Sequence, residues 1–549
     1  MQLAKNIVVV GAGFAGVYAT KKLAKRFKSN PDVTITLIDR HSYFTYLTQL
    51  HEVATERVQP DAVKYDLERL FHHAKNVQLV TDNVTAIDKE NKQVHGEHST
   101  YDFDSLIISM GGEPNDFGTP GVKENGFTLW SMEDAIALRD HIGDVIRRGA
   151  AEQDPEKRKA LLTLVVCGSG FTGAETVGEL IEYREVLAKE NRLDPSEIKV
   201  ILVEAAPTII NMLDRTNAGH AENFLKKNDI EIRTSSMITQ VNPDTVEIKD
   251  QSPIATNTLI WTAGVKTNHT ADEFGIEAGR GGRLITNKYL QAQGFEDKSI
   301  YVAGDDANAT EEGAERAVPQ TAQEAEQEAL IVAHNVAEDI NGATNYKEFK
   351  DKNMGFTVSF GSKYGIAQVF GGKRFRGRFA TLMKHGSNLL YFMRIASMYY
   401  TWKYFMDEFF NVENGRTVFG YNTSRRSNVL WSLPLRLYFG IALFIDGLAK
   451  MNGDSSWLVM GHSGFGIWEL ILGCLIFFGL ATWCANFIVI ICFFIFLHSW
   501  ATVWVLFVAF ALMNGSGRSF GLDLWFVPWL QKTLGKWRYG TQRSIYKNK

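Results

Sequence analysis

Cysteine is scarce in this sequence. Its 549 residues contain four cysteines, no two of which are spaced as Cys-x-x-Cys. They are Cys167, Cys474, Cys484 and Cys492. This scarcity argues against a disulfide framework, a thiolate zinc site and a dithiol redox centre. The last three lie in apolar runs, where cysteine is most often a small buried hydrophobic residue.

Charge is absent from 485–513, ANFIVIICFFIFLHSWATVWVLFVAFALM, which contains no Asp, Glu, Lys or Arg. One helix of this length would span about 43 Å, whereas the hydrocarbon core of a bilayer is about 30 Å thick. Two crossings would need about forty residues. We therefore expect a membrane segment with a break near His498 and Ser499, or a further crossing near 520–530.

The few charges in the C-terminal part are mostly basic. From Arg425 onward there are eleven Lys and Arg against four Asp and Glu, a balance of +7, so the preceding part carries −11 of the total −4. Because the acidic part is the larger globular one, this argues against a nucleic-acid partner and suits a basic segment beside anionic lipid. Basic residues at both ends of the membrane region favour an even number of crossings.

The N-terminus opens with an apolar stretch, 6–10, that is too short for a signal sequence and runs into GAGFAG. A helix is predicted over 17–27, and a second strand, 33–38, ends in Asp39, where an acid can bind a ribose hydroxyl. The glycines of this G-x-G-x-x-G turn are Gly11, Gly13 and Gly16. They allow a tight turn, close approach to a pyrophosphate and close helix packing. The alternative is a glycine-rich turn without a ligand.

The same pattern returns in LTLVVCGSGFTGAETVGEL, 162–180. Its second strand, 198–203, ends in Glu204, after an intervening charged helix and loop at 182–192. The glycines are Gly168, Gly170 and Gly173. A carboxylate at Glu204 would accept from the 2′-hydroxyl of NADH and repel the 2′-phosphate of NADPH. The alternative for Glu204 is a solvated strand end.

Two such units in one chain predict one nucleotide held permanently and another that exchanges, as in flavin-dependent pyridine-nucleotide reductases. The segments 101–112 and 258–265 are strands ending in Gly, where the chain would cross between nucleotide domains. SIYVAGDDAN, 299–308, then closes on Gly304 and Asp305. In this class the acid bonds the flavin ribityl chain, although Gly-Asp-Asp alone is usually a turn. The predicted fold class is α/β, with two Rossmann-like domains before an all-α transmembrane domain.

Motifs that are missing from the soluble part limit the possible electron acceptors. A disulfide reductase and a sulfide-oxidising quinone reductase both need cysteines there, and no flavin monooxygenase motif links the two glycine turns. A helix is predicted at 317–340, with Pro319 in its first turn. Gln323 and Gln327 share one of its faces and could bond a carbonyl acceptor without bringing charge. The alternative is a solvated, glutamine-rich surface.

From about 1 to 410 the chain resembles type II NADH dehydrogenases, single-chain flavoproteins that reduce membrane quinone without pumping protons. The resemblance rests on GAGFAG, YDFDSLIISMGGEPNDFGTPG, SMEDAIALRDHI, VVCGSGFTGAETVGEL, VEAAP, TLIWTAGV, YVAGDDAN and PQTAQEAEQ. It implies non-covalent FAD at Gly11, Gly13, Phe14, Ala15, Gly16, Asp39, Arg40, Gly111, Asp305, Ala322 and Gln323. It implies NADH at Gly168, Gly170, Gly173, Glu175, Glu204 and Gly264. It implies a quinone of the menaquinone or ubiquinone type near Gln323 and Gln327, and no metal.

The implied mechanism is ping-pong: NADH gives hydride to the flavin and leaves, and quinone then takes two electrons. Glu175, the catalytic residue that the resemblance implies, or water would deliver the quinol protons. Glu175 could equally be an acid stabilised by the helix dipole. In the apolar segment 43–54, Tyr46 stands where relatives often carry proline, so loop contacts are not transferred there.

The C-terminal part resembles the DoxX family of small membrane proteins, in PLRLYFGIALFIDGLAK (434–450) and GSGRSFGLD (515–523). Gly440 and Gly447 would share a helix face and allow close packing. The ionisable groups within or beside the spans are Asp446, Glu469 and His498. Such groups indicate a functional site by default, unless they lie near the interface or bond backbone.

These observations predict an FAD domain (1–120 and 290–350), an NADH domain (121–289), a hairpin with an amphipathic anchor (351–410), a linker (411–428) and a DoxX-like domain of three or four spans (429–549). We expect a multi-pass plasma-membrane protein with both nucleotide domains on the cytoplasmic side, in contact with the lipid bilayer. Whether it forms a homodimer stays open. Two other hypotheses stay open. The flavoprotein could sense NADH and recruit a membrane partner, or it could pass electrons to a partner protein or extracytoplasmic carrier.

Overall fold

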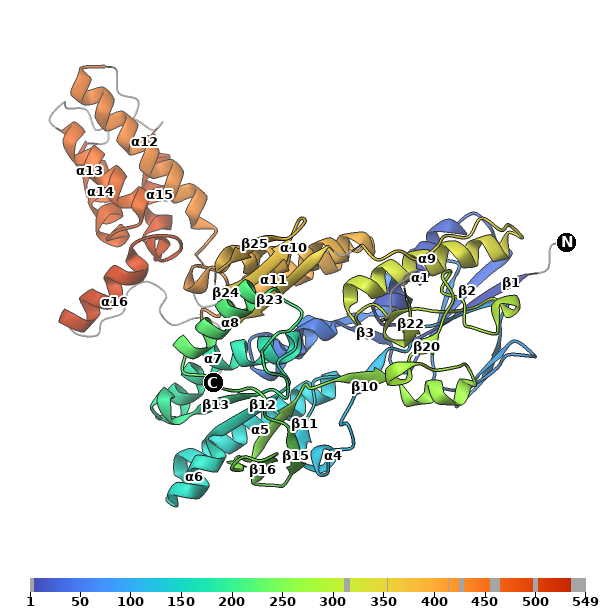
Figure 1. Ribbon diagram of the computed structural model, residues 1–549. Helices are drawn as coiled ribbons and strands as arrows, with labels where there is room; N and C mark the ends of the chain where they lie inside the picture. Colours follow the sequence, from blue (N-terminus) through green and yellow to red (C-terminus); the bar gives the residue numbers. More distant parts are fainter. Residues whose placement is uncertain are drawn as a thin grey trace. The chain divides into compact units, whose positions relative to one another are not determined.

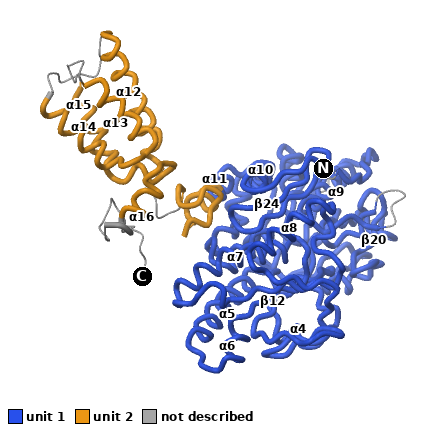
Figure 2. The backbone as a smooth tube through the Cα atoms, turned by 60° about the vertical axis from the view of Figure 1, so that its left-hand side comes forward, with its two compact units in different colours: residues 1–404 blue, residues 405–549 orange. Residues whose placement is uncertain are grey.

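The computed structural model describes residues 4–310, 316–352, 354–412, 414–423, 429–454, 465–496 and 502–534. The chain forms two compact units, unit 1 over Met1–Tyr404 and unit 2 over Phe405–Lys549 (Figure 2). Each unit is described by itself.

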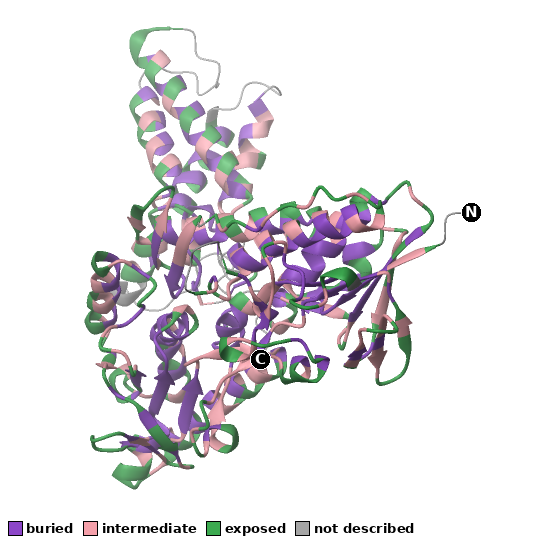
Figure 3. Ribbon diagram, turned by 45° about the vertical axis from the view of Figure 1, so that its right-hand side comes forward, coloured by how far each residue is buried: buried purple, intermediate pink, exposed green. Residues whose placement is uncertain are grey.

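Unit 1 contains two five-stranded parallel sheets (Figure 1). The first has the strand order β21-β9-β1-β2-β5. Its strands are β21 (Ile300–Val302), β9 (Ser105–Ile108), β1 (Lys5–Val10), β2 (Val33–Asp39) and β5 (Val77–Thr81). Helices α1 (Phe14–Arg26) and α9 (Ala322–Ile340) pack against each other beside this sheet. Most residues of the inner strands are buried and apolar, as expected for parallel strands covered by helices (Figure 3).

The second sheet has the order β11-β18-β12-β13-β14. Its strands are β11 (Gly126–Phe127), β18 (Thr258–Trp261), β12 (Thr163–Cys167), β13 (Lys199–Val203) and β14 (Glu231–Arg233). The helices around it include α5 (Met132–Ala151), α7 (Phe171–Asn191) and α8 (Arg215–Lys227). The prediction of two parallel α/β units is confirmed.

The chain passes between the two sheets through a short ribbon. Strand β10 (Gly112–Pro114) follows β9 and pairs antiparallel with β19 (Val265–Thr267), which follows β18. The outgoing and returning chain therefore lie side by side. This is the crossing that the glycine-ended strands at 101–112 and 258–265 predicted.

A three-stranded antiparallel sheet follows α9. It comprises β23 (Gly355–Phe360), β24 (Tyr364–Val369) and β25 (Lys373–Arg376), and α10 (Arg378–Arg394) packs on it. Helix α7 approaches β23 closely, because a Cβ atom added at Gly178 would lie 2.2 Å from the Cα of Phe360. This close approach places the side chains of α7 next to those of β23.

Two local predictions were wrong. Residues 182–192 do not start a separate helix, because α7 runs unbroken from Phe171 to Asn191. Pro319 does not open the next helix, which begins at Ala322 after the N-cap Thr321. The aromatic segment at 389–410 contains the end of α10, at Arg394, and a second helix, α11 (Met398–Phe409).

Unit 2 contains the helices α12 (Ser432–Asn452), α13 (Gly466–Phe478), α14 (Thr482–Phe496), α15 (Val503–Leu512) and α16 (Asp523–Leu534). Helices α12 and α13 lie side by side in extensive contact. Glycine makes this close contact possible. A Cβ atom added at Gly440 would lie 2.7 Å from the backbone nitrogen of Phe477, and one added at Gly447 would lie 2.6 Å from the carbonyl oxygen of Gly466. The predicted close packing at these two glycines is confirmed.

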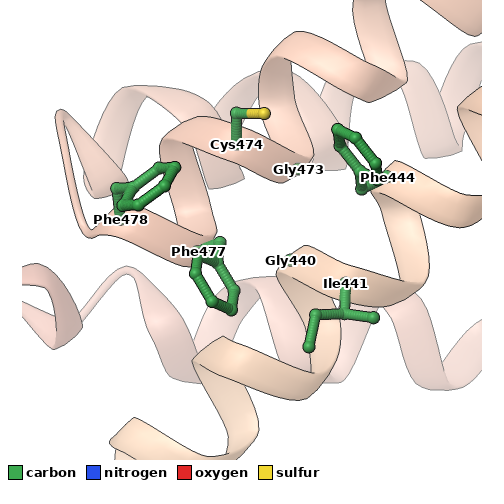
Figure 4. Close-up of a pocket in the computed structure, with 7 residues that line it drawn as sticks. All are labelled: Gly440, Ile441, Phe444, Gly473, Cys474, Phe477 and Phe478. Carbon is green, nitrogen blue, oxygen red and sulfur yellow. The ribbon is translucent and has the colours of Figure 1, made fainter.

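Gly440 on α12 and Gly473 on α13 line an apolar pocket of about 230 Å³ (Figure 4). Its lining residues are Gly440, Ile441, Phe444, Gly473, Cys474, Phe477 and Phe478. Its walls are therefore wholly apolar.

The charge-free run at 485–513 forms two helices that pack against each other, α14 ending at Phe496 and α15 beginning at Val503. The predicted breakpoint, His498 and Ser499, lies outside the described residues. Within the described part of the chain, α12 is the one helix long and apolar enough to cross a membrane, and α13, α14 and α15 are shorter apolar helices.

Candidate functional site

The first glycine turn joins β1 to α1. Gly11 has φ +96°, and a Cβ atom there would lie 2.2 Å from the carbonyl oxygen of Ser109. A Cβ atom at Gly16 would lie 1.8 Å from the carbonyl oxygen of Gly11. These two glycines are required by packing, whereas Gly13 faces open space. The surface above Gly13 is therefore free for a ligand to approach the backbone.

Asp39 is held beside this turn at the end of β2. Its Oδ2 accepts from the backbone N–H of Ala12 at 2.6 Å, and its Oδ1 accepts from that of His41 at 2.8 Å. Burial raises the pKa of this carboxyl above its ordinary value. Arg40, the next residue, is exposed.

The second glycine turn, between β12 and α7, repeats this geometry. Gly168 has φ +95°, and a Cβ atom there would lie 2.6 Å from the Cα of Ala263. A Cβ atom at Gly173 would lie 1.9 Å from the carbonyl oxygen of Gly168, while Gly170 faces open space. Gly264 lies next to Ala263, and a Cβ atom there would lie 2.6 Å from the ring of Phe117.

Glu204 has the same relation to this turn as Asp39 has to the first. Its Oε2 accepts from the N–H of Ser169 at 2.8 Å and from its hydroxyl at 2.6 Å. Its Oε1 accepts from the N–H of Ala206 at 2.8 Å. The carboxylate is therefore fixed at the strand end beside the open glycine.

Both helices that follow these turns start without a side-chain cap. The N-cap residues are Gly13 and Gly170, and the first turn of each helix contains no acid. In contrast, α5 is capped by Ser131 and α8 by Asp214. Free N–H groups at a helix start attract phosphate. Together with the open glycines, this fits two nucleotide pyrophosphates.

The Gly-Asp-Asp turn lies next to the first glycine turn. A Cβ atom at Gly304 would lie 3.2 Å from that of Ala15. The N–H of Gly304 donates to Glu328 Oε2 at 2.6 Å, and the N–H of Gly111 donates to Asp306 Oδ2 at 2.8 Å. Burial raises the pKa of Asp306 to about 8 and that of Asp305 to about 6.

Helix α9 starts beside this turn with Ala322 and Gln323. The side chain of Gln323 donates to Glu324 Oε1 at 3.0 Å. Gln327, one turn later, contacts another segment: its Oε1 accepts from the N–H of Lys352 at 2.9 Å. The segment around the start of α9 contacts the Gly-Asp-Asp turn, because the side chain of Gln320 donates to the carbonyl oxygen of Asp305 at 3.0 Å, and Gln327 bonds to residues 351–352.

Glu175 lies in a buried group of charged side chains. Its Oε1 accepts from the N–H and the hydroxyl of Ser359 at 3.0 and 3.1 Å. The Nζ of Lys384 lies 3.3 Å from Glu175 Oε1 and 3.2 Å from Glu52 Oε1. The Nε2 of His51 lies 3.9 Å from Glu175 Oε2. Side chains from α7, α10 and the segment 43–54 therefore converge.

Arg57 extends this group. It pairs with Glu52 and, through Nε at 3.0 Å, with Glu179, and all three side chains are at most 2% exposed. Three carboxylates thus share two cations, Arg57 and Lys384. We use the name buried charge cluster for six residues: His51, Glu52, Arg57, Glu175, Glu179 and Lys384.

Burial shifts the pKa values of the ionisable side chains in this region. Burial lowers the pKa of His51 to about 4 and that of its neighbour His385 to about 3. Burial alone would lower the pKa of Lys384, but Glu175 and Glu52 outweigh it and raise that pKa. At neutral pH the two histidines are therefore neutral and Lys384 is charged.

Comparison with known proteins identifies the family. The family model described as pyridine nucleotide-disulphide oxidoreductase matches residues 5–329. A type II NADH:quinone oxidoreductase from Staphylococcus saprophyticus is 31% identical over 384 residues, covering 69% of this chain and 93% of that protein. One from Staphylococcus aureus (strain NCTC 8325) is 32% identical over 383 residues, with the same coverage. This chain belongs to the type II NADH:quinone oxidoreductase family.

The structure of NDH2 from Plasmodium falciparum in complex with NADH is similar to this chain, with a TM-score of 0.65 and 16% identity, covering 74% of this chain and 97% of that one. The sulfide:quinone oxidoreductase of Aquifex aeolicus has a TM-score of 0.59 and 18% identity, covering 72% and 92%. At these identities the likeness concerns the fold. Family membership confirms the predicted enzyme class and its cofactors, FAD and NADH.

Sequence reasoning about this type II oxidoreductase missed most of the buried charge cluster. Only Glu175 was predicted as a site residue. His51 and Glu52 interrupt a segment rich in apolar residues, and Glu179 is followed directly by Leu180 and Ile181. A polar residue in such a position must find a buried partner, which is the signal that could have revealed the cluster.

His51, Glu52 and Glu179 also have ligand atoms within 4.8 Å of one another, a spacing that a metal ion could use. Arg57 pairs with both carboxylates, however, and Lys384 with Glu52. The protein's own cations therefore already balance this group.

Proposed function

We propose that this chain oxidises NADH and reduces a membrane quinone of the menaquinone or ubiquinone type, with FAD bound non-covalently in unit 1. The observation that carries the proposal is the repeated turn. Each copy has an open second glycine, an uncapped helix and a strand-end carboxylate fixed by backbone N–H groups. Two such sites in one unit fit two nucleotides.

In this proposal the first turn holds FAD, which when bound accepts hydride from NADH and passes two electrons to the quinone. Asp39 would bind a ribose hydroxyl, and Asp305 the ribityl chain. The remaining residues proposed to contact FAD are Gly11, Gly13, Phe14, Ala15, Gly16, Arg40, Gly111, Ala322 and Gln323. The contact of the 304–306 turn with Ala15 supports a single site formed by these segments.

The second turn would hold NADH through Gly168, Gly170, Gly173 and Gly264. Glu204 sets the preference between nucleotides, because a fixed carboxylate accepts from a 2′-hydroxyl and repels a 2′-phosphate. Its bonds to Ser169 and Ala206 keep it from turning away.

The buried charge cluster would supply a proton to the quinone. Reduction of a quinone to a quinol takes up two protons, and Glu175 is the group proposed to pass one of them. Lys384 lies within 3.3 Å of Glu175 and stays charged, so it holds the carboxylate in place and stabilises it after proton loss.

Gln323 and Gln327 are proposed to face the quinone head from α9. Gln323 is half-buried next to the Gly-Asp-Asp turn. Gln327 bonds to Lys352 through its amide oxygen. When quinone binds at Gln327, the hydrogen bond to Lys352 must therefore either remain beside the quinone or be replaced by a bond to the quinone.

Membrane attachment is proposed for both units. Unit 1 exposes large apolar side chains along α10 and α11, including Phe379, Leu390, Met393, Met398, Tyr399 and Trp402. Unit 2 exposes apolar side chains on all its long helices while charged residues lie buried inside, as expected for a protein surrounded by lipid. Helix α12 is about 31 Å long, which matches a bilayer core.

We further propose a multi-pass DoxX-like domain of three or four spans, with unit 1 on the cytoplasmic side and no coupling to proton pumping. The short helices α13, α14 and α15, and the packing of α14 on α15, support several passes over one.

The test is catalysis by the full-length protein in liposomes. We expect NADH oxidation to depend on added menaquinone or ubiquinone analogue, NADPH to be a poor substrate, and a trapped pH dye to report no acidification. NADH-dependent flavin reduction without quinone turnover would instead favour electron transfer to a partner protein, and would refute the proposal.

A further inference from the structure

The interior of unit 2 contains a charged triad on α12 and α13. Asp446 and Glu469 are fully buried, and Lys450 is 6% exposed. The Nζ of Lys450 lies 2.9 Å from Asp446 Oδ2 and 2.5 Å from Glu469 Oε1. On the same helices, Ile445 and Ile467 are more than half exposed. The triad is therefore enclosed within a bundle whose outer surface is apolar.

Close packing prevents the triad from opening. Gly447 follows Asp446, and a Cβ atom there would lie 2.6 Å from the carbonyl oxygen of Gly466 on the facing helix. A Cβ atom at Gly466 would in turn lie 2.8 Å from the carbonyl oxygen of Gly447. The two carboxylates are thus held across one ammonium group by backbones in direct contact.

Among the described residues, both carboxyl groups of the triad contact the same lysine. Two carboxylates face one ammonium, and the other titratable group of the described residues next to Glu469 is the thiol of Cys492 on α14. Glu469 Oε2 is buried and has no hydrogen-bond partner among the described residues. A buried carboxylate oxygen without a donor is costly, and two carboxylates that share a site retain a proton between them.

Asp523, elsewhere in unit 2, shows what a buried anion needs. Its carboxylate accepts from the N–H of Ala481 at 2.6 Å, from the N–H of Thr482 at 3.0 Å and from the hydroxyl of Thr482 at 2.6 Å. Three donors stabilise its charge. Glu469 Oε2 has no such donor among the described residues.

We propose that Asp446, Lys450 and Glu469 form a proton-binding site, in which Glu469 carries the proton on Oε2 while Lys450 stays an ammonium bonded to both carboxyl groups. Binding forms one O–H bond on Glu469 and neutralises its carboxylate. The site is independent of the nucleotide sites of unit 1, and goes beyond the electron transfer proposed for them.

The direct test is labelling of the full-length protein in liposomes with dicyclohexylcarbodiimide, which reacts with protonated carboxyl groups in apolar surroundings. Peptide mass spectrometry should locate an adduct on Glu469 and none on Asp523. Infrared spectroscopy should show the carbonyl stretch of a protonated carboxylic acid, lost in Glu469→Gln. Absence of both the adduct and the band overturns the proposal, because Glu469 is then ionised.

A second variant tests whether Glu469 keeps its proton because it shares the site with the carboxylate of Asp446. Asp446→Asn removes one negative charge and leaves Lys450 and Glu469 as a neutral ion pair, so both the adduct and the infrared band should disappear. Asp454→Asn is the matched control, because Asp454 lies just after α12 and is exposed. It should leave both signals unchanged. Persistence of the adduct in Asp446→Asn would overturn charge sharing, and quinone reductase activity reports separately on the function proposed for unit 1.

Discussion

Replacement of Glu204 by Gln should weaken the preference for NADH over NADPH. Glu204 is fixed at the end of β13 by the N–H groups of Ser169 and Ala206, so its charge has a defined position. At about 5 Å and an effective dielectric constant of about 20, one unit charge on the carboxylate opposes one on a phosphate by about 3 kcal/mol. Solvent reduces this at a half-buried site to about 1–3 kcal/mol, a factor of roughly 10–100.

The assay is the ratio of kcat/KM for NADH to that for NADPH, with quinone saturating. We expect Glu204→Gln to lower this ratio by about 10–100-fold. The fold should survive, since the amide loses about one hydrogen bond, worth roughly 1 kcal/mol. Glu231→Gln is the control, because Glu231 lies at the start of the neighbouring strand β14 and is exposed. An unchanged ratio in Glu204→Gln would refute the assignment of this carboxylate to the ribose.

The other predictions concern the second glycine turn, proton delivery and acid stability. Gly170→Val fills the open space above the second turn. It should raise KM for NADH at least about tenfold and leave the FAD content unchanged. Gly13→Val, at the first turn, should instead cause loss of FAD. Lys384→Met should slow reoxidation of the reduced flavin by quinone about 100-fold or more, with reduction by NADH unchanged, in stopped-flow absorbance. Burial lowers the pKa of His51 to about 4 from 6.5. Between these values the unfolded chain binds a proton that the folded protein does not, so the free energy of unfolding should fall as pH falls, by about 1.4 kcal/mol per pH unit. Denaturant unfolding at pH 7 and pH 5 should show this fall, and it should be smaller in His51→Asn.

Each of these has an outcome that contradicts it. Equal loss of FAD in both glycine variants would mean that the two turns do not bind separate nucleotides. A Lys384→Met protein that is slow in reduction by NADH would place Lys384 on the other half of the reaction. An acid dependence unchanged in His51→Asn would mean that His51 is not the group that titrates.

The glycine turns and their strand-end acids could be predicted because their causes are local. Gly11 meets Gly16 within a single turn, and Gly168 meets Gly173 in the same way. Asp39 and Glu204 lie at the ends of strands paired directly with the strands before the turns. Pattern and spacing were therefore enough.

The buried charge cluster could not be predicted in this way. Lys384 and Glu52 are separated by 332 residues, and Arg57 and Glu179 by more than a hundred. Their meeting depends on how α7 packs on β23 and α10, which no spacing in the sequence encodes. Only the presence of isolated charges in apolar segments indicated that partners existed.

The helices of unit 2 were predicted in part. The length of the charge-free run indicated more than one helix, and α14 and α15 are two. The triad of unit 2 was not assembled, because Asp446 and Glu469 lie on separate helices whose contact depends on Gly447 and Gly466. The number of membrane crossings stays a prediction.

The most direct test of the electron-transfer account is anaerobic titration of the full-length protein in liposomes. One equivalent of NADH should bleach the flavin absorbance, and one equivalent of a menaquinone analogue should then restore it, with both steps at least as fast as steady-state turnover. Bleaching without restoration by any quinone would contradict the account.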